Sequence, residues 1–180
     1  SMIFERLPLN GAFIIKPMPI SDDRGEFARF FCKEEFKRMN LETEFVQHSV
    51  AKNTKTGTLR GLHFQRPPFE EIKIVRCLNG KIYDVIVDIR QSSATFGRWA
   101  AVELSSENLH ALYVPAGFAH GYITLTDYSD VYYMISEYYD VNSAETIVWN
   151  DSRLQIEWPA RPKQISLKDS TGMKFTELHI

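Results

Sequence analysis

The chain has 180 residues, a length typical of one domain, and its 21 Lys and Arg residues nearly balance 23 Asp and Glu residues. Hydrophobic residues make up 44% of the sequence, which is enough for a core and excludes a wholly disordered chain. The sequence lacks the polybasic run expected of a nucleic-acid partner, and no apolar stretch reaches the roughly 18 residues of a membrane helix. We therefore expect a single domain over residues 2–180, with neither a nucleic-acid nor a membrane partner.

Composition also bears on location and fold class. Cys32 and Cys77 are too few for a disulfide framework and fit a reducing compartment. No signal peptide opens the chain, so the predicted localisation is cytoplasmic. Aromatic residues make up 13%, Gly and Pro number 9 and 8, and helix-length apolar patterns are scarce. These features favour an all-β domain.

The first 41 residues predict two strands and one helix. Residues 11–19 form an apolar segment that ends at Pro17 and Pro19, and residues 26–31 form a second short strand pattern. Residues 33–41 carry acidic side chains first and basic side chains later, which is the charge order of a short helix.

From residue 44 onward the sequence predicts strand after strand. Residues 81–90 alternate most cleanly, with Tyr83 and Val85 on one face and Asp84 on the other. The pair Asn79-Gly80 before this segment is typical of a hairpin turn. We predict a loop at 115–121 and an irregular tail from about 150. The remaining predicted strands are 44–52, 58–65, 71–78, 98–104, 110–115, 122–126 and 131–139. So many short strands predict a sandwich or a closed double sheet.

Several side chains suited to acid–base chemistry lie inside these strands. His63 lies mid-strand and is either a functional group or a hydrogen-bonded structural histidine. Lys73 lies between isoleucines, so its ammonium group either reaches a sheet edge or faces a cavity or an anion. Arg60 and His63 are three residues apart and would face opposite sides of a regular strand, but Gly61 between them allows a bulge that re-aims one. Tyr133 and Tyr139 share a face if their strand is regular, and aromatic packing is the alternative reading.

A metal site is a competing hypothesis. Double-sheet β domains often bind a metal through a His-x-His pair and a later carboxylate. Here the residue two after His63 is Gln65, so the paired imidazoles are missing even though His120, Glu70 and Glu71 are available. The sequence therefore disfavours metal catalysis, and we predict neither a metal nor another cofactor.

Five segments, taken in order, resemble the dTDP-4-dehydrorhamnose 3,5-epimerase family. The similarity extends from Asp23 to Asp169. The segments are LRGLHFQRPPFEEIKIVRC, GKIYDVIVDIRQSSATFGRW, LYVPAGFAHGYITL, YYMISEYY, and IVWND with IEWP. The resemblance implies a cupin-type double-stranded β-helix, or jelly roll, with a few short helices. It also implies an isomerase that acts on a nucleotide-linked 4-keto-6-deoxy sugar by proton abstraction and return, in deoxysugar (rhamnose) and surface-polysaccharide synthesis.

The resemblance also assigns roles to residues. By position, His63 matches the base, Asp169 its carboxylate partner, Tyr133 the acid and Lys73 the cation that stabilises the enolate. The residues that match substrate contacts are Arg24 and Arg60 for the diphosphate, and Gln47, His120 and Tyr139 around the sugar and nucleotide. In the family the N-terminal strands, here about 11–31, are exchanged between two subunits. The resemblance thus implies a homodimer in which Arg24 reaches the neighbouring site.

Three departures from the family pattern leave the substrate open. Arg29 replaces a common Glu, Gln47-His48-Ser49 replaces Gln-x-Asn, and the turn after that strand is one residue longer. The leading prediction is a 3,5-epimerase. The alternatives are an epimerase of one centre, at C3 or C5, that acts on another nucleotide-linked 4-keto sugar, a related ketoisomerase, a sugar-binding cupin without catalysis, and a metal-dependent cupin oxygenase.

Overall fold

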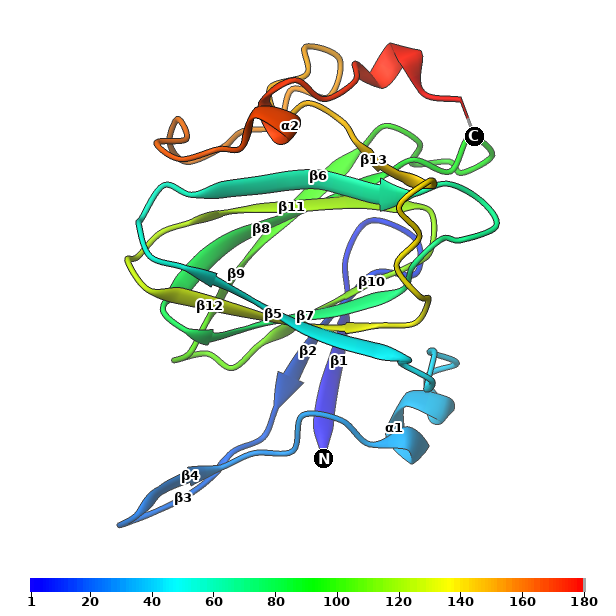
Figure 1. Cartoon of the computed structure of the whole chain (residues 1–180). Coiled ribbons are helices and arrows are strands. Elements are labelled where there is room, and N and C mark those ends of the chain that lie inside the picture. Colours follow the sequence, from blue (N-terminus) through cyan, green and yellow to red (C-terminus); the bar gives the residue numbers. More distant parts are fainter. Residues whose placement is uncertain (180) are drawn as a thin grey trace.

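Two antiparallel sheets form the body of the computed structural model, which describes residues 1–179 (Figure 1). The larger sheet has the order β1 (Met2–Arg6), β2 (Phe13–Pro17), β10 (Ala111–Val114), β7 (Lys73–Asn79), β12 (Ser129–Ile135) and β5 (Gln47–Asn53). The smaller sheet has the order β13 (Ala144–Thr146), β6 (Leu59–Gln65), β11 (Phe118–Thr124), β8 (Lys81–Asp88) and β9 (Trp99–Ser105). This stacked arrangement confirms the predicted all-β jelly roll.

The helices are short. They are α1 (Lys33–Arg38), α2 (Leu167–Ser170) and the 3-10 turn Phe175–Glu177. Among the described residues no helix has the length and apolar character needed to cross a membrane.

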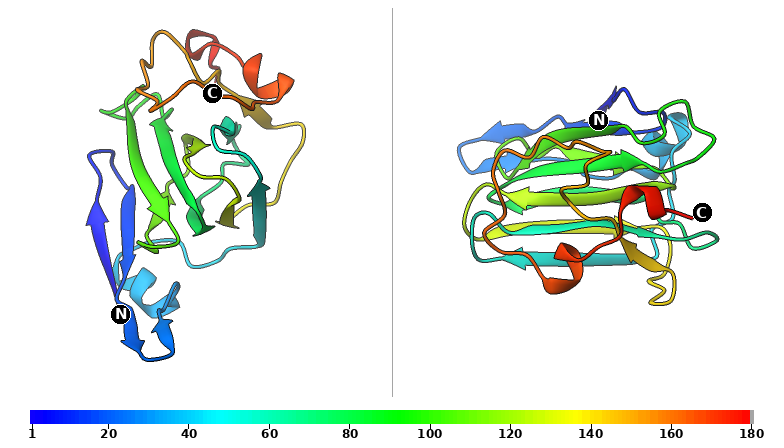
Figure 2. Two further views of the ribbon diagram at one scale, coloured as in Figure 1. Left: turned by 90° about the vertical axis from the view of Figure 1, so that its left-hand side faces the viewer. Right: turned by 90° about the horizontal axis from the view of Figure 1, so that it is seen from above.

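Apolar side chains fill three layers. Between the sheets, Val75 and Leu112 of the larger sheet pack with Ile82 and Ile86 of the smaller sheet. The C-terminal tail lies across the outer face of the smaller sheet in both views, and this face has its own cluster that includes Val85, Val87, Leu154 and Leu178 (Figure 2). A third cluster, with Ile15, Ile74 and Phe36, covers the outer face of the larger sheet. Both faces of β8 are buried. Its alternating side chains therefore point either into the space between the sheets or into the cluster beneath the C-terminal tail. Asp84 and Asp88 point inward and are fully buried.

The predicted hairpin at Asn79-Gly80 is wrong. The turn exists, and Gly80 has φ +80°, but it joins β7 of the larger sheet to β8 of the smaller sheet. The strands that flank it therefore do not pair with each other. Each pairs instead with strands that are more distant in sequence, β10 and β12 for β7 and β11 and β9 for β8. A turn motif specifies only a local change of chain direction. Which strands pair depends on how the apolar faces of the two sheets are buried.

Several boundaries also differ from the prediction. The strand expected over 26–31 ends at Phe27, and β1 was missed although all five of its residues pair with β2. The loop expected over 115–121 is partly strand, because β11 begins at Phe118 and includes His120. The strand expected over 131–139 ends at Ile135, so Tyr139 lies in the following loop.

A two-stranded arm projects from the body at the bottom of Figure 1. It consists of β3 (Ile20–Asp22) and β4 (Gly25–Phe27), which pair only with each other. Every residue of both strands is exposed, including Ile20 at 73% and Phe27 at 76%. The arm therefore presents apolar side chains that the same chain leaves uncovered.

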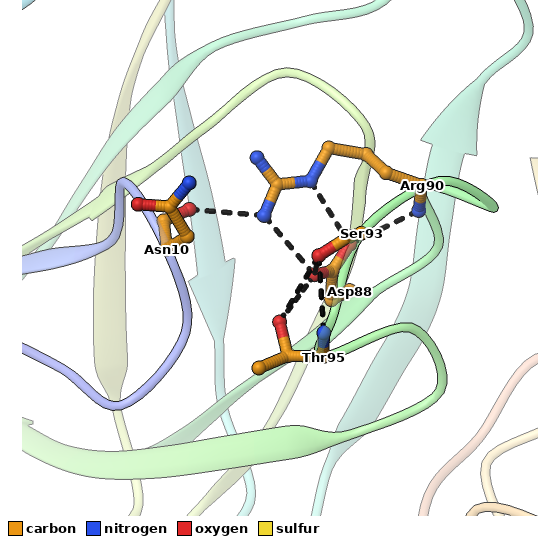
Figure 3. Close-up of polar contacts among 5 residues, drawn as sticks. All are labelled: Asn10, Asp88, Arg90, Ser93 and Thr95. Atoms are coloured by element: carbon orange, nitrogen blue, oxygen red, sulfur yellow. Dashed lines mark hydrogen bonds and ion pairs between the residues drawn. The ribbon is translucent and has the colours of Figure 1, made fainter.

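The loop after β8 is held by a buried carboxylate. Asp88 accepts hydrogen bonds from the Arg90 guanidinium and from the hydroxyl groups of Ser93 and Thr95, and Arg90 also donates to the Asn10 carbonyl at 2.9 Å (Figure 3). Burial alone would raise the pKa of Asp88, but these donors lower it to about 2. These hydrogen bonds fix the loop after β8 and tie it to the N-terminal segment that leads into β2.

Candidate active site

A cavity of about 270 Å³ opens between the two sheets. His63 and His120 reach it from β6 and β11 of the smaller sheet, and Lys73 and Tyr133 reach it from β7 and β12 of the larger sheet. Tyr139 lines the cavity from the loop after β12. Five of the predicted site residues therefore meet in one place, although they lie up to 76 positions apart in the sequence, from His63 to Tyr139.

Asp169 lies behind His63. The carboxylate Oδ1 is 2.8 Å from His63 Nε2, and Oδ2 accepts the Gly61 N–H at 3.1 Å. Ser166 holds this carboxylate in place, because it caps α2 by accepting the Asp169 N–H at 3.1 Å. Burial opposes ionisation of Asp169, but the His63 hydrogen bond and charge and the Gly61 N–H lower its pKa below the ordinary value. An ionised Asp169 accepts a hydrogen bond from His63 Nε2–H, so Nδ1 of the same ring is left as the basic nitrogen.

His120 and Asp84 form a second His–Asp pair, and His120 lines the cavity. His120 Nε2 is 2.6 Å from Asp84 Oδ1, and both side chains are buried. Burial raises the pKa of Asp84, and the charge and hydrogen bond of His120 and the charge of Lys73 partly offset this effect. The other Asp84 oxygen has no hydrogen-bond partner within residues 1–179. Lys73 is also buried, and its Nζ lies 3.7 Å from Glu71. Lys73 therefore places a cation at the cavity, and His120 places there an imidazole held by Asp84.

Tyr133 stays protonated at neutral pH. Burial is the largest cause that raises the pKa of its phenol well above 10, and the charges of Tyr122 and Asp84 add to it. His63 comes from β6 of the smaller sheet and Tyr133 from β12 of the larger sheet, so an imidazole and a phenol line the same cavity from opposite sheets. Figure 1 shows the positions of the two strands.

The bulge predicted at Gly61 is confirmed. The register between β6 and β11 shifts between His120 and Tyr122, so one extra residue lies on β6. Gly61 has φ +120°, and a Cβ there would lie 2.6 Å from the Gly121 Cα, so only glycine fits. Arg60 is exposed beside the cavity and adjoins a groove that Asp169 and Ser166 also line. Its Nε donates to Asn53 Oδ1 at 2.8 Å.

Two residues that were predicted to contact the substrate, Gln47 and Arg24, do not line the cavity. The Oε1 atom of Gln47 accepts the Tyr139 N–H at 2.9 Å and so holds the loop that carries Tyr139. Arg24 lies on the arm with a side chain that is 90% exposed and paired with Asp22, so this chain does not bring it to its own cavity.

Five further polar residues also line the cavity: Ser49, Gln65, Glu71, Glu145 and Lys168. The position of Lys168 beside Asp169 was the available signal for it. Gln65 and Glu71 were considered only in connection with a metal site, and Ser49 only as a departure from the family pattern. Nothing in its local pattern marks Glu145.

Arg29, another departure, pairs with a residue of its own chain. Its guanidinium lies 3.1 Å from Glu35, which also accepts the Met2 N–H at 2.8 Å. Arg29 therefore serves to anchor α1 and the N-terminus in this structure. Within residues 1–179, no three His, Cys, Asp or Glu side chains gather closely enough to hold a metal ion.

A model of the dTDP-4-dehydrorhamnose 3,5-epimerase family matches residues 6–177. The chain belongs to the dTDP-4-dehydrorhamnose 3,5-epimerase family. This confirms the predicted resemblance and makes the protein an isomerase that acts on a carbohydrate. A dTDP-4-dehydrorhamnose 3,5-epimerase of Shigella flexneri is 42% identical over 165 residues, which cover 91% of this chain and 91% of the relative.

Solved structures agree with this assignment. A dTDP-6-deoxy-D-glucose-3,5-epimerase of Legionella pneumophila, in complex with dTDP-4-keto-L-rhamnose, has a TM-score of 0.94 at 34% identity, covering 99% of this chain and 95% of its own. A 3'-monoepimerase of Streptomyces bikiniensis, in complex with dTDP-quinovose, has a TM-score of 0.89 at 30% identity, covering 96% and 87%. The fold of this epimerase family thus accommodates inversion of one centre as well as two.

Proposed function

We propose that this chain inverts C3 and C5 of dTDP-4-dehydro-6-deoxy-D-glucose. The observation that carries the proposal is the pairing of His63, backed by Asp169, with Tyr133 on the opposite wall of one cavity. Inversion of carbon next to a ketone needs a base on one face and an acid on the other. It changes no oxidation state, so we propose that it needs neither a metal nor a redox cofactor.

His63 is the proposed base. Its Nδ1 takes the proton from C3 or C5, and the electron pair of that C–H bond moves toward the C4 carbonyl oxygen to form an enolate. The resulting imidazolium donates to Asp169, whose lowered pKa keeps it an anion at neutral pH. This pairing offsets part of the energy cost of charging the histidine.

Lys73 is the proposed cation for the enolate oxygen. The Lys73 side chain is buried, so its ammonium group stabilises a new negative charge nearby more than it would in water. His120, fixed by Asp84, is proposed to form a second hydrogen bond to the sugar through its other ring nitrogen.

Tyr133 is the proposed acid. Because the pKa of the Tyr133 phenol is raised, it is a weak acid, but the enolate carbon that it would protonate is a strong base. The enolate electron pair forms the new C–H bond on the opposite face, and the O–H electron pair stays on the phenolate oxygen. The centre is inverted as a result.

Positive side chains beside the cavity suit the diphosphate. Arg60 uses Nε for Asn53, and within the described residues its two terminal nitrogens have no hydrogen-bond partner, so they remain for a pair of phosphate oxygens. Lys168 adds a charge at the cavity wall, and the 58% exposed Tyr139 offers an aromatic face to the nucleotide. The bound dTDP-sugar of the Legionella relative supports this class of substrate.

The proposed assembly is a homodimer that exchanges the strands over residues 11–31. The arm supports this proposal, because Ile20 and Phe27 are exposed on it and Arg24 extends away from its own cavity. An exchanged arm would bring the Arg24 guanidinium to the diphosphate of the neighbouring subunit. The proposed localisation is the cytoplasm, where nucleotide sugars for rhamnose and surface polysaccharide are made.

Deuterium uptake tests the function. The protein is incubated in heavy water with dTDP-4-dehydro-6-deoxy-D-glucose, and the mass of the sugar nucleotide is measured. We expect two deuterons in the product and none with His63→Ala. One deuteron would indicate an epimerase of a single centre, like the Streptomyces neighbour. No uptake, with binding retained, would indicate a sugar-binding cupin and refute the proposal.

A further inference from the structure

Gln65 is a buried amide at the end of β6 that the proposed mechanism does not use. It is 4% exposed and lines the cavity, two residues after His63 on the same strand. A polar side chain at such a position costs stability unless its groups are hydrogen-bonded. Its hydrogen-bond partners therefore indicate what Gln65 does.

The side chain of Gln65 bonds backbone groups of two different loops. Its Oε1 accepts the Asp140 N–H at 2.7 Å. Its Nε2 donates to the Phe69 carbonyl at 2.8 Å and to the Tyr138 carbonyl at 3.2 Å. A flipped amide would set its oxygen against two carbonyls and its NH₂ group against an N–H, so these neighbours fix its orientation. Both amide hydrogens are used in this way, so Gln65 serves the loops rather than a substrate.

Gln47 holds one of these loops from the other sheet. Residues 136–143 cross from β12 of the larger sheet to β13 of the smaller sheet (Figure 1). Gln47 on β5 accepts the Tyr139 N–H at 2.9 Å, and Gln65 binds the Tyr138 carbonyl, which belongs to the same peptide unit. The N–H of the next peptide unit is held by Gln65 as well. The peptide units before and after Tyr139 are therefore both fixed by side chains.

This arrangement fixes the backbone of Tyr139 although the residue lies in a loop. Its ring is 58% exposed and lines the cavity, so it can offer a face to a bound molecule. Ordering a loop and its side chain at the moment of binding costs affinity, and a backbone that is fixed beforehand avoids part of that cost. The hydrogen bonds of the two glutamines thus prepare the ring for a ligand.

The loop that precedes β7 is joined to the same structure. The Ser136 N–H donates to the Ile72 carbonyl at 2.9 Å, and Ser136 Oγ accepts the Ile72 N–H at 2.8 Å. The bond from Gln65 to the Phe69 carbonyl adds a second link from the same loop. Loss of the Gln65 amide would therefore release backbone groups of both loops beside the cavity.

We propose that Gln65 is a positioning residue that fixes Tyr139 as a rigid aromatic face for the nucleotide, with Gln47 as its counterpart on the larger sheet. This inference rests on the proposed function, because that function assigns Tyr139 to the nucleotide. Neither glutamine carries a proton in the proposed reaction. Their effect therefore falls on affinity for the nucleotide rather than on proton transfer.

Gln65→Met tests this assignment, because methionine keeps the length of the side chain and removes its amide. We expect the Kd for dTDP, measured by titration calorimetry, to rise about fivefold, within the range expected when one side chain must be ordered on binding. KM for the dTDP-sugar should rise by the same factor. The value of kcat should change by less than about twofold, because the lost interaction is made equally in the ground state and the transition state.

A double-mutant cycle with Tyr139→Ala separates this role from a general loosening of the fold. If Gln65 acts through the Tyr139 ring, its replacement should no longer weaken dTDP binding once that ring is gone. The double variant should then bind dTDP as Tyr139→Ala does alone.

Asn108→Leu is the matched control. Like Gln65, Asn108 uses its amide to hold backbone groups of a turn: Oδ1 accepts the Ser105 N–H at 3.1 Å and the His110 N–H at 2.8 Å, and Nδ2 donates to the Glu103 carbonyl at 2.9 Å. This turn joins β9 to β10, and Asn108 is not among the cavity residues. The variant should keep the Kd of the unmodified protein.

The outcomes separate the inference from the function. The proposal is overturned if the Kd of Gln65→Met lies within about twofold of that of Asn108→Leu, or if its replacement weakens binding equally with and without the Tyr139 ring. A fall in kcat as large as the rise in KM overturns it too. If Gln65→Met does not fold, Gln47→Met, whose side chain lies outside the cavity, must meet the same criteria. Failure of the unmodified protein to bind dTDP would instead refute the proposed substrate.

Discussion

Replacing Asp169 by Asn removes the charge behind His63, the proposed base, while retaining the shape of the side chain. In the protein, Asp169 Oδ1 is 2.8 Å from His63 Nε2 and Oδ2 accepts the Gly61 N–H. An amide can still bond the imidazole, but it provides no counter-charge for the imidazolium and can hold the ring in the wrong tautomer. The loss should therefore appear in the step that charges His63.

The magnitude follows from the distance and the exposure of the pair. With the two delocalised charges about 4 Å apart, the attraction is about 1 kcal/mol in water and about 4 kcal/mol at the effective dielectric of a protein surface. The His63 side chain is 44% exposed and that of Asp169 is 7% exposed, so an intermediate value applies. We expect the barrier to rise by about 2–3 kcal/mol, which is a fall in kcat of about 30- to 150-fold.

The assay compares kcat, KM and deuterium uptake of Asp169→Asn with those of the unmodified protein. Exchange and epimerisation should fall together, because both require abstraction by His63, and KM should change little. Asp151→Asn is a suitable control: Asp151 is a buried carboxylate in the same C-terminal segment that accepts backbone N–H groups, and it is not among the cavity residues. A kcat within twofold of that control would refute the role assigned to Asp169.

Three further changes test other parts of the molecule. Lys73→Met should raise the barrier by about 2.7–4 kcal/mol if Lys73 stabilises the enolate oxygen, and a loss in kcat below fivefold would assign Lys73 to structure. Asp88→Asn should lower the free energy of unfolding by about 2 kcal/mol at neutral pH, because the pKa of Asp88 falls from 3.8 to about 2 on folding. That contribution is present above pH 4 and disappears as the pH falls toward 2, so denaturant titrations of variant and unmodified protein should converge there. Gly61→Ala should destabilise the fold by about 1–3 kcal/mol, measured by the same titrations, and unchanged stability would show that the bulge tolerates a Cβ.

The sequence by itself determined most of the strands, though not β1, β3 and β13, and it named five of the residues that line the cavity. Period-two alternation in residues 81–90 and apolar runs between turn residues are local properties, so the strands could be placed to within a few residues. The resemblance named His63, Lys73, His120, Tyr133 and Tyr139, and all five line one cavity. The bulge at Gly61 was also predictable, because a residue without Cβ between two polar strand residues permits it.

Only the tertiary structure decided which strands pair and which distant groups meet. Asn79-Gly80 has the sequence of a hairpin, yet β7 and β8 lie in different sheets, because each strand buries both faces against remote partners. Asp169 reaches His63 across 106 positions, and Asn53 reaches Tyr122 across 69. No local pattern marks these pairs, since their hydrogen bonds form only when the sheets and the C-terminal segment pack together.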